Sequence, residues 1–147
     1  MMTRQQRNTR NVLVVLAAAL VVGSFAVPAF NGYLARSRVA RAVSDIGTMS
    51  LKLHQWQRDG NTLPRTLAEA GISTVDPWGR PYIYLRAADA SRSQLRKDGE
   101  LVPLNTDFDL YSFGPDGVSA LALPAAPSRD DVVRAANGAF IGVAANY

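Results

Sequence analysis

The sequence lacks cysteine entirely and contains one histidine, His54. The absence of cysteine excludes disulfide bonds and thiolate chemistry, and a single histidine between Leu53 and Gln55 is more often an exposed or packed side chain than a metal ligand. No glycine-rich phosphate loop follows a strand-like segment, and no motif pairs a nucleophile with a base. We therefore predict that the protein is not an enzyme and that it binds no organic cofactor.

Acidic residues are absent from the first 44 positions, where six arginines give a charge of +6. The other ten of the sixteen Lys and Arg residues share residues 45–147 with all twelve acids, which leaves a charge of −2 there. The basic excess therefore lies in the N-terminal segment. This distribution favours arginines that contact anionic lipid headgroups, and we predict no nucleic-acid partner.

Charged residues are also absent from Val12–Phe30, a run of nineteen residues behind Arg10. Three interpretations compete for this run: a buried core helix, a cleaved secretory signal and a retained membrane helix. In the second interpretation, cleavage at Ser24-Phe25-Ala26 would release a soluble periplasmic binding module that starts after Ala26. In the third, three arginines before the run and three after it leave the orientation undecided.

The pattern that follows the run favours the retained helix. Apolar residues recur alternately four and three positions apart, as on one face of a helix: Ala42, Ile46, Met49, Leu53 and Trp56. We predict one long helix from about Asn11 to about Asp59, kinked at Pro28. Residues 1–34 are then the basic and hydrophobic segment, and residues 35–147 are the globular head.

The head shows the local signals of a small antiparallel sheet. Composition and alternation predict strands at residues 82–85 and 107–113, and residues 118–123 fit a short third strand. A capping box at Thr66–Glu69 predicts a short helix that ends at Gly71, and residues 86–104 are expected to form a variable surface loop. Asp107 and Asp109 should share a solvated face of their strand. We predict an α+β fold in which the helix packs on these residues: Trp78, Tyr82, Tyr84, Phe108 and Leu110.

Three segments of the chain have characteristic sequence motifs. They are Val27-Pro28 with Ala42–Ile46 in the helix, Asp76–Tyr82 before the first strand, and Asp109–Gly117 after the second. In these segments the chain resembles the type IV pilin-like superfamily, and most closely the major pseudopilin of type II secretion systems. The resemblance covers most of the chain except residues 86–104 and the C-terminal tail, and it is most specific where Asp-Pro-Trp-Gly precedes Tyr-Ser-x-Gly-x-Asp-Gly.

This resemblance implies a pilin-like α+β fold and a structural subunit of a filament that assembles through its N-terminal hydrophobic helix. The implied partners are copies of the chain, other pilin-like subunits, inner-membrane assembly proteins and membrane lipid. The implied location is the inner membrane, crossed once, with the head in the periplasm or in an extracellular filament. Ala17-Ala18-Ala19 and Gly23 supply small residues for close helix packing.

The chain departs from the family at two positions near its N-terminus. Alignment on Pro28 places Gln6-Arg7 where the family carries the glycine-phenylalanine site of prepilin peptidase. The same alignment places Asn11 where the family carries a glutamate that pairs with the N-terminal amine of a neighbouring subunit. Asn11 can donate and accept hydrogen bonds, but it cannot neutralise an ammonium group.

The resemblance also implies a calcium ion in the loop after the last strands of the head. Calcium takes about six to eight oxygen ligands, which include carboxylates and backbone carbonyls. Asp116 matches the family position, and Asp130 and Asp131 offer further carboxylates, so these three residues are the predicted ligands. In the alternative interpretation, Asp116 only builds an Asp-Gly turn, and Asp130 and Asp131 cap a helical turn at Val132.

Overall fold

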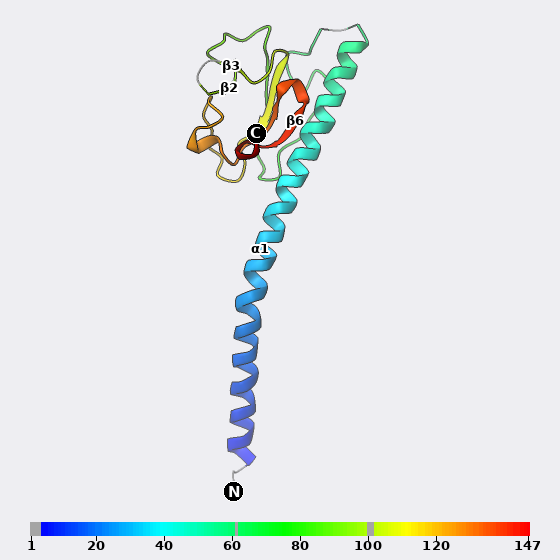
Figure 1. Cartoon of the computed structure of the whole chain (residues 1–147). Helices are drawn as coiled ribbons and strands as arrows, with labels where there is room; N and C mark the ends of the chain where they lie inside the picture. The colour runs from blue at the N-terminus through cyan, green and yellow to red at the C-terminus, as the bar shows by residue number, and fades with distance from the viewer. Residues whose placement is uncertain (1–3, 61, 100–101) are drawn as a thin grey trace. The chain divides into compact units, whose positions relative to one another are not determined.

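The computed structural model describes residues 4–60, 62–99 and 102–147, except for the side chains of eleven residues between Gln6 and Ala26. One helix, α1, runs Arg4–Arg58 and continues through Pro28 (Figure 1). It begins before the predicted Asn11 and ends next to the predicted Asp59. Contacts divide the chain into two compact units, Met1–Ser37 and Arg38–Tyr147, and α1 contributes to both.

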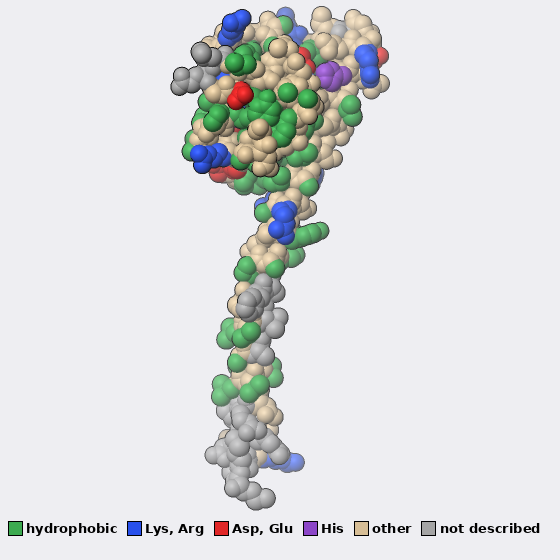
Figure 2. Space-filling model, in the orientation of Figure 1, with side chains coloured by type: hydrophobic (Ala, Val, Ile, Leu, Met, Phe, Trp, Pro, Cys, Tyr) green, Lys and Arg blue, Asp and Glu red, His purple; other side chains and the backbone are tan. Residues whose placement is uncertain are grey.

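In the unit Met1–Ser37, the helix presents apolar side chains to solvent (Figure 2, green). Eight of them are between 54% and 76% exposed: Leu13, Val14, Val15, Leu16, Leu20, Val21, Val27 and Phe30. Among the residues that the structure describes, no helix contains a stretch long and apolar enough to cross a membrane, so the predicted transmembrane helix is not confirmed. Some side chains on which the predictions of processing and helix packing depend lie outside the described ones: Gln6, Arg7, Ala18, Ala19 and Gly23.

A four-stranded antiparallel sheet forms the centre of the unit Arg38–Tyr147, which we call the head. Its strands, in spatial order, are β1 (Ile83–Arg86), β4 (Phe108–Ser112), β5 (Val132–Ala135) and β6 (Phe140–Val143). β1 and β4 confirm the first two predicted strands. Two short strands, β2 (Lys97–Asp98) and β3 (Val102–Pro103), pair with each other, and three single-turn 3-10 helices complete the head: η1 (Ala126–Ser128), η2 (Ala136–Gly138) and η3 (Ala144–Asn146).

The second half of α1 packs on one face of this sheet. Its buried side chains contact those of the sheet in one apolar cluster: Ala42, Ile46, Met49, Leu53, Ile72, Tyr82, Phe108, Leu110 and Val132. Trp78 and Tyr84 are half-buried at its border. Trp56 is also only half-buried, and its indole N–H donates to the carbonyl of Thr62 at 3.0 Å. The predicted helix-on-sheet packing is therefore confirmed.

The other face of the sheet is covered by chain segments that the sequence predicted to lie at the surface. Side chains alternate along a strand, so Tyr111, Val133 and Ala135 point away from α1. They pack in a second cluster with Leu104, Leu123 and Ala144. The segment 86–104 is thus only partly a surface loop, because it contains β2 and β3 and buries Leu104 against the sheet.

Three local predictions are wrong. One capping-box hydrogen bond exists, from the N–H of Glu69 to Thr66 Oγ1 at 3.3 Å, whereas the Glu69 carboxylate accepts the N–H of Arg65. Residues 66–71 form a bend and turns and not a helix. Residues 118–123 form no strand and contribute one isolated bridge, between Ala122 and Lys97. Val132 begins strand β5, so Asp130 and Asp131 cap no helical turn.

The helix–sheet contact offers a matched pair of substitutions two residues apart in α1. Leu53 is 0% exposed and lies in the apolar cluster, whereas Leu51 is 70% exposed. We expect Leu53→Ala to lower the free energy of unfolding of the full-length chain in mild detergent by about 2–5 kcal/mol, because it leaves a cavity. Leu51→Ala should change it by no more than about 0.5 kcal/mol. Urea unfolding followed by circular dichroism measures both, and equal losses would contradict this packing.

Candidate functional site

Two turns that carry the characteristic motifs lie against each other in the head. The carboxylate of Asp76 is 2% exposed and joins them. Its Oδ1 accepts the backbone N–H groups of Trp78 at 3.0 Å and Arg80 at 2.8 Å. Its Oδ2 accepts the hydroxyl of Ser112 at 2.6 Å, at the end of β4. We call residues 76–81 and 114–117 the paired turns.

Arg80 makes the second connection between the paired turns. Its guanidinium donates to the carbonyl of Gly114 and lies beside Gly117. Gly114 (φ 65°) and Gly117 (φ 74°) have left-handed backbone conformations that favour glycine. A Cβ at Gly114 would also clash with the carbonyl of Asp130. The glycines of the motif are therefore required by backbone conformation and by close packing.

The structure separates the three predicted calcium ligands into two groups. The N–H of Asp116 donates to Asp130 Oδ2 at 3.2 Å, so these two residues adjoin each other at the surface. Asp116 Oδ1 accepts the N–H of Val118 at 2.9 Å, as the Asp-Gly turn interpretation predicts. Asp131 is 0% exposed and turns inward to Arg96. Among the described residues, no three acidic or histidine side chains converge on a common metal position.

The ion pair between Arg96 and Asp131 is the feature that sequence reasoning missed. Arg96 Nη1 lies 2.8 Å from Asp131 Oδ2, and Ser119 Oγ lies 2.6 Å from both atoms. Arg96 is 2% exposed, although it belongs to a segment that the sequence predicted to be a variable loop. The only local indication that Arg96 is buried is the neighbouring Leu95, because the partners of Arg96 lie 23 and 35 positions further along the chain.

Burial shifts the pKa of Asp131. Loss of hydration raises this pKa to about 6, although the Ser119 hydroxyl and the Arg96 guanidinium lower it in part. The neighbouring charge of Asp130 adds a small upward contribution. Burial raises the pKa of Asp109 as well, against hydrogen bonds from Asn105 and from the backbone of Arg96. Both carboxylates therefore lie in surroundings where ionisation is costly.

Asp107 and Asp109 do not share a solvated face. Asp109 is 1% exposed, and it accepts the N–H of Arg96 at 2.7 Å and the side-chain amide of Asn105 at 2.9 Å. Asp107 instead pairs with Arg134, with its Oδ2 2.6 Å from Nη2. Burial alone would raise the pKa of Asp107, but hydrogen bonds from Arg134 and from the Phe108 backbone hold it below its usual value. Each carboxylate thus contacts a different arginine.

Arg134 is the second buried arginine, and it faces α1. Its Nε donates to Ser50 Oγ at 3.1 Å, and its guanidinium lies 3.9 Å from the centre of the Phe108 ring. The Nε2 of His54 lies 3.4 Å from its Nη2, and the His54 ring packs on Phe108 with centroids 5.6 Å apart. His54 is therefore a packed side chain, as predicted.

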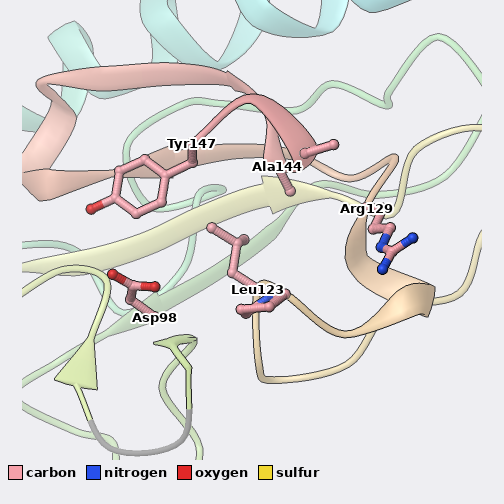
Figure 3. Close-up of a pocket in the computed structure, with 7 residues that line it drawn as sticks. Asp98, Leu123, Arg129, Ala144 and Tyr147 are labelled. Carbon is pink, nitrogen blue, oxygen red and sulfur yellow. The ribbon is translucent and has the colours of Figure 1, made fainter.

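A pocket of about 490 Å³ lies on the face of the head that is remote from α1 (Figure 3). Leu123 and Ala144 form its apolar base, and Asp98, Arg129 and Tyr147 stand around it. These side chains place no nucleophile next to a base.

The raised pKa of Asp131 predicts a pH-dependent stability with a definite sign. The folded pKa near 6 lies above the ordinary value of an aspartate, so the contribution of Asp131 is fully present below about pH 4 and is lost as pH rises through 6. A shift of this size corresponds to at most about 3 kcal/mol.

We expect the free energy of unfolding of wild type minus that of Asp131→Asn to fall between pH 4 and pH 7 and then to stay constant. The subtraction cancels the contributions to the free energy of unfolding from groups that both chains share, such as Asp109, Asp107 and His54. Urea unfolding of the full-length chain at a series of pH values measures this difference. A difference that does not vary with pH would show that Asp131 titrates normally.

Comparisons with known proteins agree with this architecture. The chain is 30% identical over 124 residues to the type II secretion system core protein G of Pectobacterium carotovorum subsp. carotovorum, and the match covers 73% of each chain. No family model matches the chain, and no solved structure matches it. With this identity and coverage, and with a long helix packed on an antiparallel sheet, the chain belongs to the family of the type II secretion core protein G, the major pseudopilin.

Proposed function

We propose that this chain is a structural subunit of a pseudopilus-type filament in a type II secretion system, and that it carries out no catalysis. The observation that supports this most directly is its similarity to a core protein of that system over 73% of both chains. The second support is the N-terminal part of α1, from Arg4 to Ser37, whose described apolar side chains are exposed. A subunit of a helical bundle would leave such side chains exposed before assembly.

The N-terminal helix is the assembly element in this proposal. Leu13, Leu16 and Leu20 follow each other at helical spacing and are 61%, 54% and 76% exposed. In a filament, the same helix of neighbouring copies would cover them. The gain would come from close packing between helices, because lipid chains are as apolar as leucine and give no hydrophobic drive for association. Ala17, exposed on the same helix, would allow neighbouring backbones to approach closely.

The same proposal includes other pilin-like subunits and inner-membrane assembly proteins as partners, with the head on the periplasmic side or in an extracellular filament. Asn11 stands where the family carries its glutamate, so the contact at this position would be a hydrogen bond and not an ion pair. Assembly of this chain should therefore depend less on ionic strength than an assembly that uses a buried carboxylate–ammonium pair.

Cysteine cross-linking tests the helix contact cleanly, because the chain has no cysteine of its own. Leu16→Cys in a chain expressed with the other components of the secretion system should give disulfide-linked dimers under mild oxidation, since bundled helices bring equivalent positions close together. Val102→Cys, at a head residue that is 63% exposed, serves as the control and should remain monomeric. Immunoblots without reducing agent distinguish the two. Equal cross-linking of both variants, or of neither, would contradict assembly through the helix.

The intact mass of the chain recovered from cells separates this proposal from its alternative. A chain that begins at Val27 would have lost most of its apolar helix, and the soluble binding module would then be the correct interpretation. A chain that keeps Leu13–Phe30 and sediments with the membrane fraction or with filaments supports the pseudopilus subunit. The fractionation also determines whether lipid covers the helix before assembly.

We further propose calcium binding by Asp116 and Asp130, which adjoin each other at the paired turns. Asp131 is not part of this set, because Arg96 already contacts its carboxylate. For a site of extracellular type, with a Kd on the order of 0.1–1 mM, 1 mM calcium would add about 0.4–1.4 kcal/mol to the stability of the folded chain.

We expect calcium to raise the melting temperature of the full-length chain relative to chelator, and Asp116→Ala to abolish the rise. Asp98→Ala removes an exposed acid elsewhere on the head and should leave the rise unchanged. Differential scanning calorimetry measures all three chains. Identical melting temperatures of wild type with calcium and with chelator would leave Asp116 as a turn residue.

A further inference from the structure

We propose that the Arg96 guanidinium takes the role that the resemblance assigns to a calcium ion. It fastens the loop that covers the sheet, so that the head folds without calcium. The loop in question consists of residues 95–99, 102–107 and 113–131, on both sides of β4. These segments cover the face of the sheet that α1 leaves free, and they contain β2, β3 and the second of the paired turns.

Arg96 connects three separate parts of the chain. Through its guanidinium it contacts Asp131, directly before β5, and Ser119 in the segment after the paired turns. It also lies over the ring of Tyr111 in β4, with 4.4 Å between the guanidinium carbon and the ring centre. A single side chain thus holds the loop to the central strand and to the strand beside it.

The backbone of Arg96 extends the same connection. Its N–H donates to Asp109 Oδ2 at 2.7 Å, and its carbonyl accepts the N–H of Leu104 at 2.8 Å. Leu104 is buried in the cluster on this face. The backbone of Arg96 therefore fixes the position of β2, which follows it directly, and of the buried Leu104.

The groups around the Arg96 guanidinium would be a poor set of ligands for a calcium ion. Calcium requires about six to eight oxygen atoms. Among the described residues, only Asp131 Oδ2 and Ser119 Oγ lie within hydrogen-bond distance of the guanidinium, whose Nε and Nη2 have no partner there. The aromatic face of Tyr111 attracts a flat cation through its quadrupole but is not a ligand for calcium. Arg96 and Ser119 thereby occupy Asp131 Oδ2, whereas Oδ1 has no hydrogen-bond partner among the described residues. An ion at Asp116 and Asp130 would add to a loop that is already fixed.

Thermal unfolding of the full-length chain in mild detergent tests the proposal. Wild type should melt in one cooperative transition in excess EDTA, with the loop intact. Arg96→Met should lower the melting temperature by about 10 °C or more in both EDTA and calcium, because it leaves the buried Asp131 carboxylate without a partner. Arg92→Met is the matched control, since Arg92 is exposed in the same loop, and it should melt with wild type.

A double variant keeps the test decisive if Arg96→Met folds poorly. Replacing both members of a buried ion pair by apolar residues restores stability in general, whereas breaking the pair does not. Arg96→Met with Asp131→Leu should therefore melt well above Arg96→Met alone, and hydrogen exchange should show protection returning to the loop on both sides of β4. Unfolding of wild type in EDTA, an unchanged melting temperature of Arg96→Met, or no recovery in the double variant would each overturn the proposal.

Discussion

The packing of α1 on the sheet depends on one buried cation, Arg134. It is 1% exposed, and its partners come from α1 (Ser50), from the segment before β4 (Asp107) and from β4 itself, where it donates to the carbonyl of Phe108 at 3.0 Å. A guanidinium buried without these partners would cost several kcal/mol, so helix and sheet cannot slide past each other without a large penalty. The apolar cluster around Leu53 supplies most of the driving force, and Arg134 selects one arrangement of it.

The two buried arginines make their polar contacts on opposite faces of the sheet. Arg134 faces α1, Arg96 faces the loop, and Asn105 lies between them, with its amide 2.9 Å from Asp109 and 3.0 Å from the carbonyl of Arg134. Asp131 retains a raised pKa beside Arg96, so this pair contributes little net stability. The role of the pair is to specify one arrangement of the loop. An incorrectly placed loop would leave two buried charges unpaired, which costs more free energy than leaving both charges in water.

Features with local causes could be predicted from the sequence, and features with distant partners could not. The spacing of Ile46, Met49 and Leu53 gave the helix face, and alternation around Phe108 gave β4, because these patterns depend on neighbours in sequence. β5 was missed since Val132-Val133-Arg134-Ala135 is buried on both faces and shows no alternation. The Asp131 and Asp109 contacts were missed for another reason: Arg96 looks like any surface arginine until the loop folds over the sheet.

Most of the family motifs lie in the head, and only Val27-Pro28 lies in the N-terminal unit. Arg80 donates to Gly114 across 34 residues, and Asp76 accepts from Ser112 across 36, so changing one member of a pair leaves the other without its partner. These hydrogen bonds of Asp76 and Arg80 lie within the head. A chain can therefore keep a pseudopilin head while it loses the usual processing site and glutamate. Exposed apolar side chains such as Leu20 need only a matching surface, and identical helices from neighbouring copies would supply it without either motif.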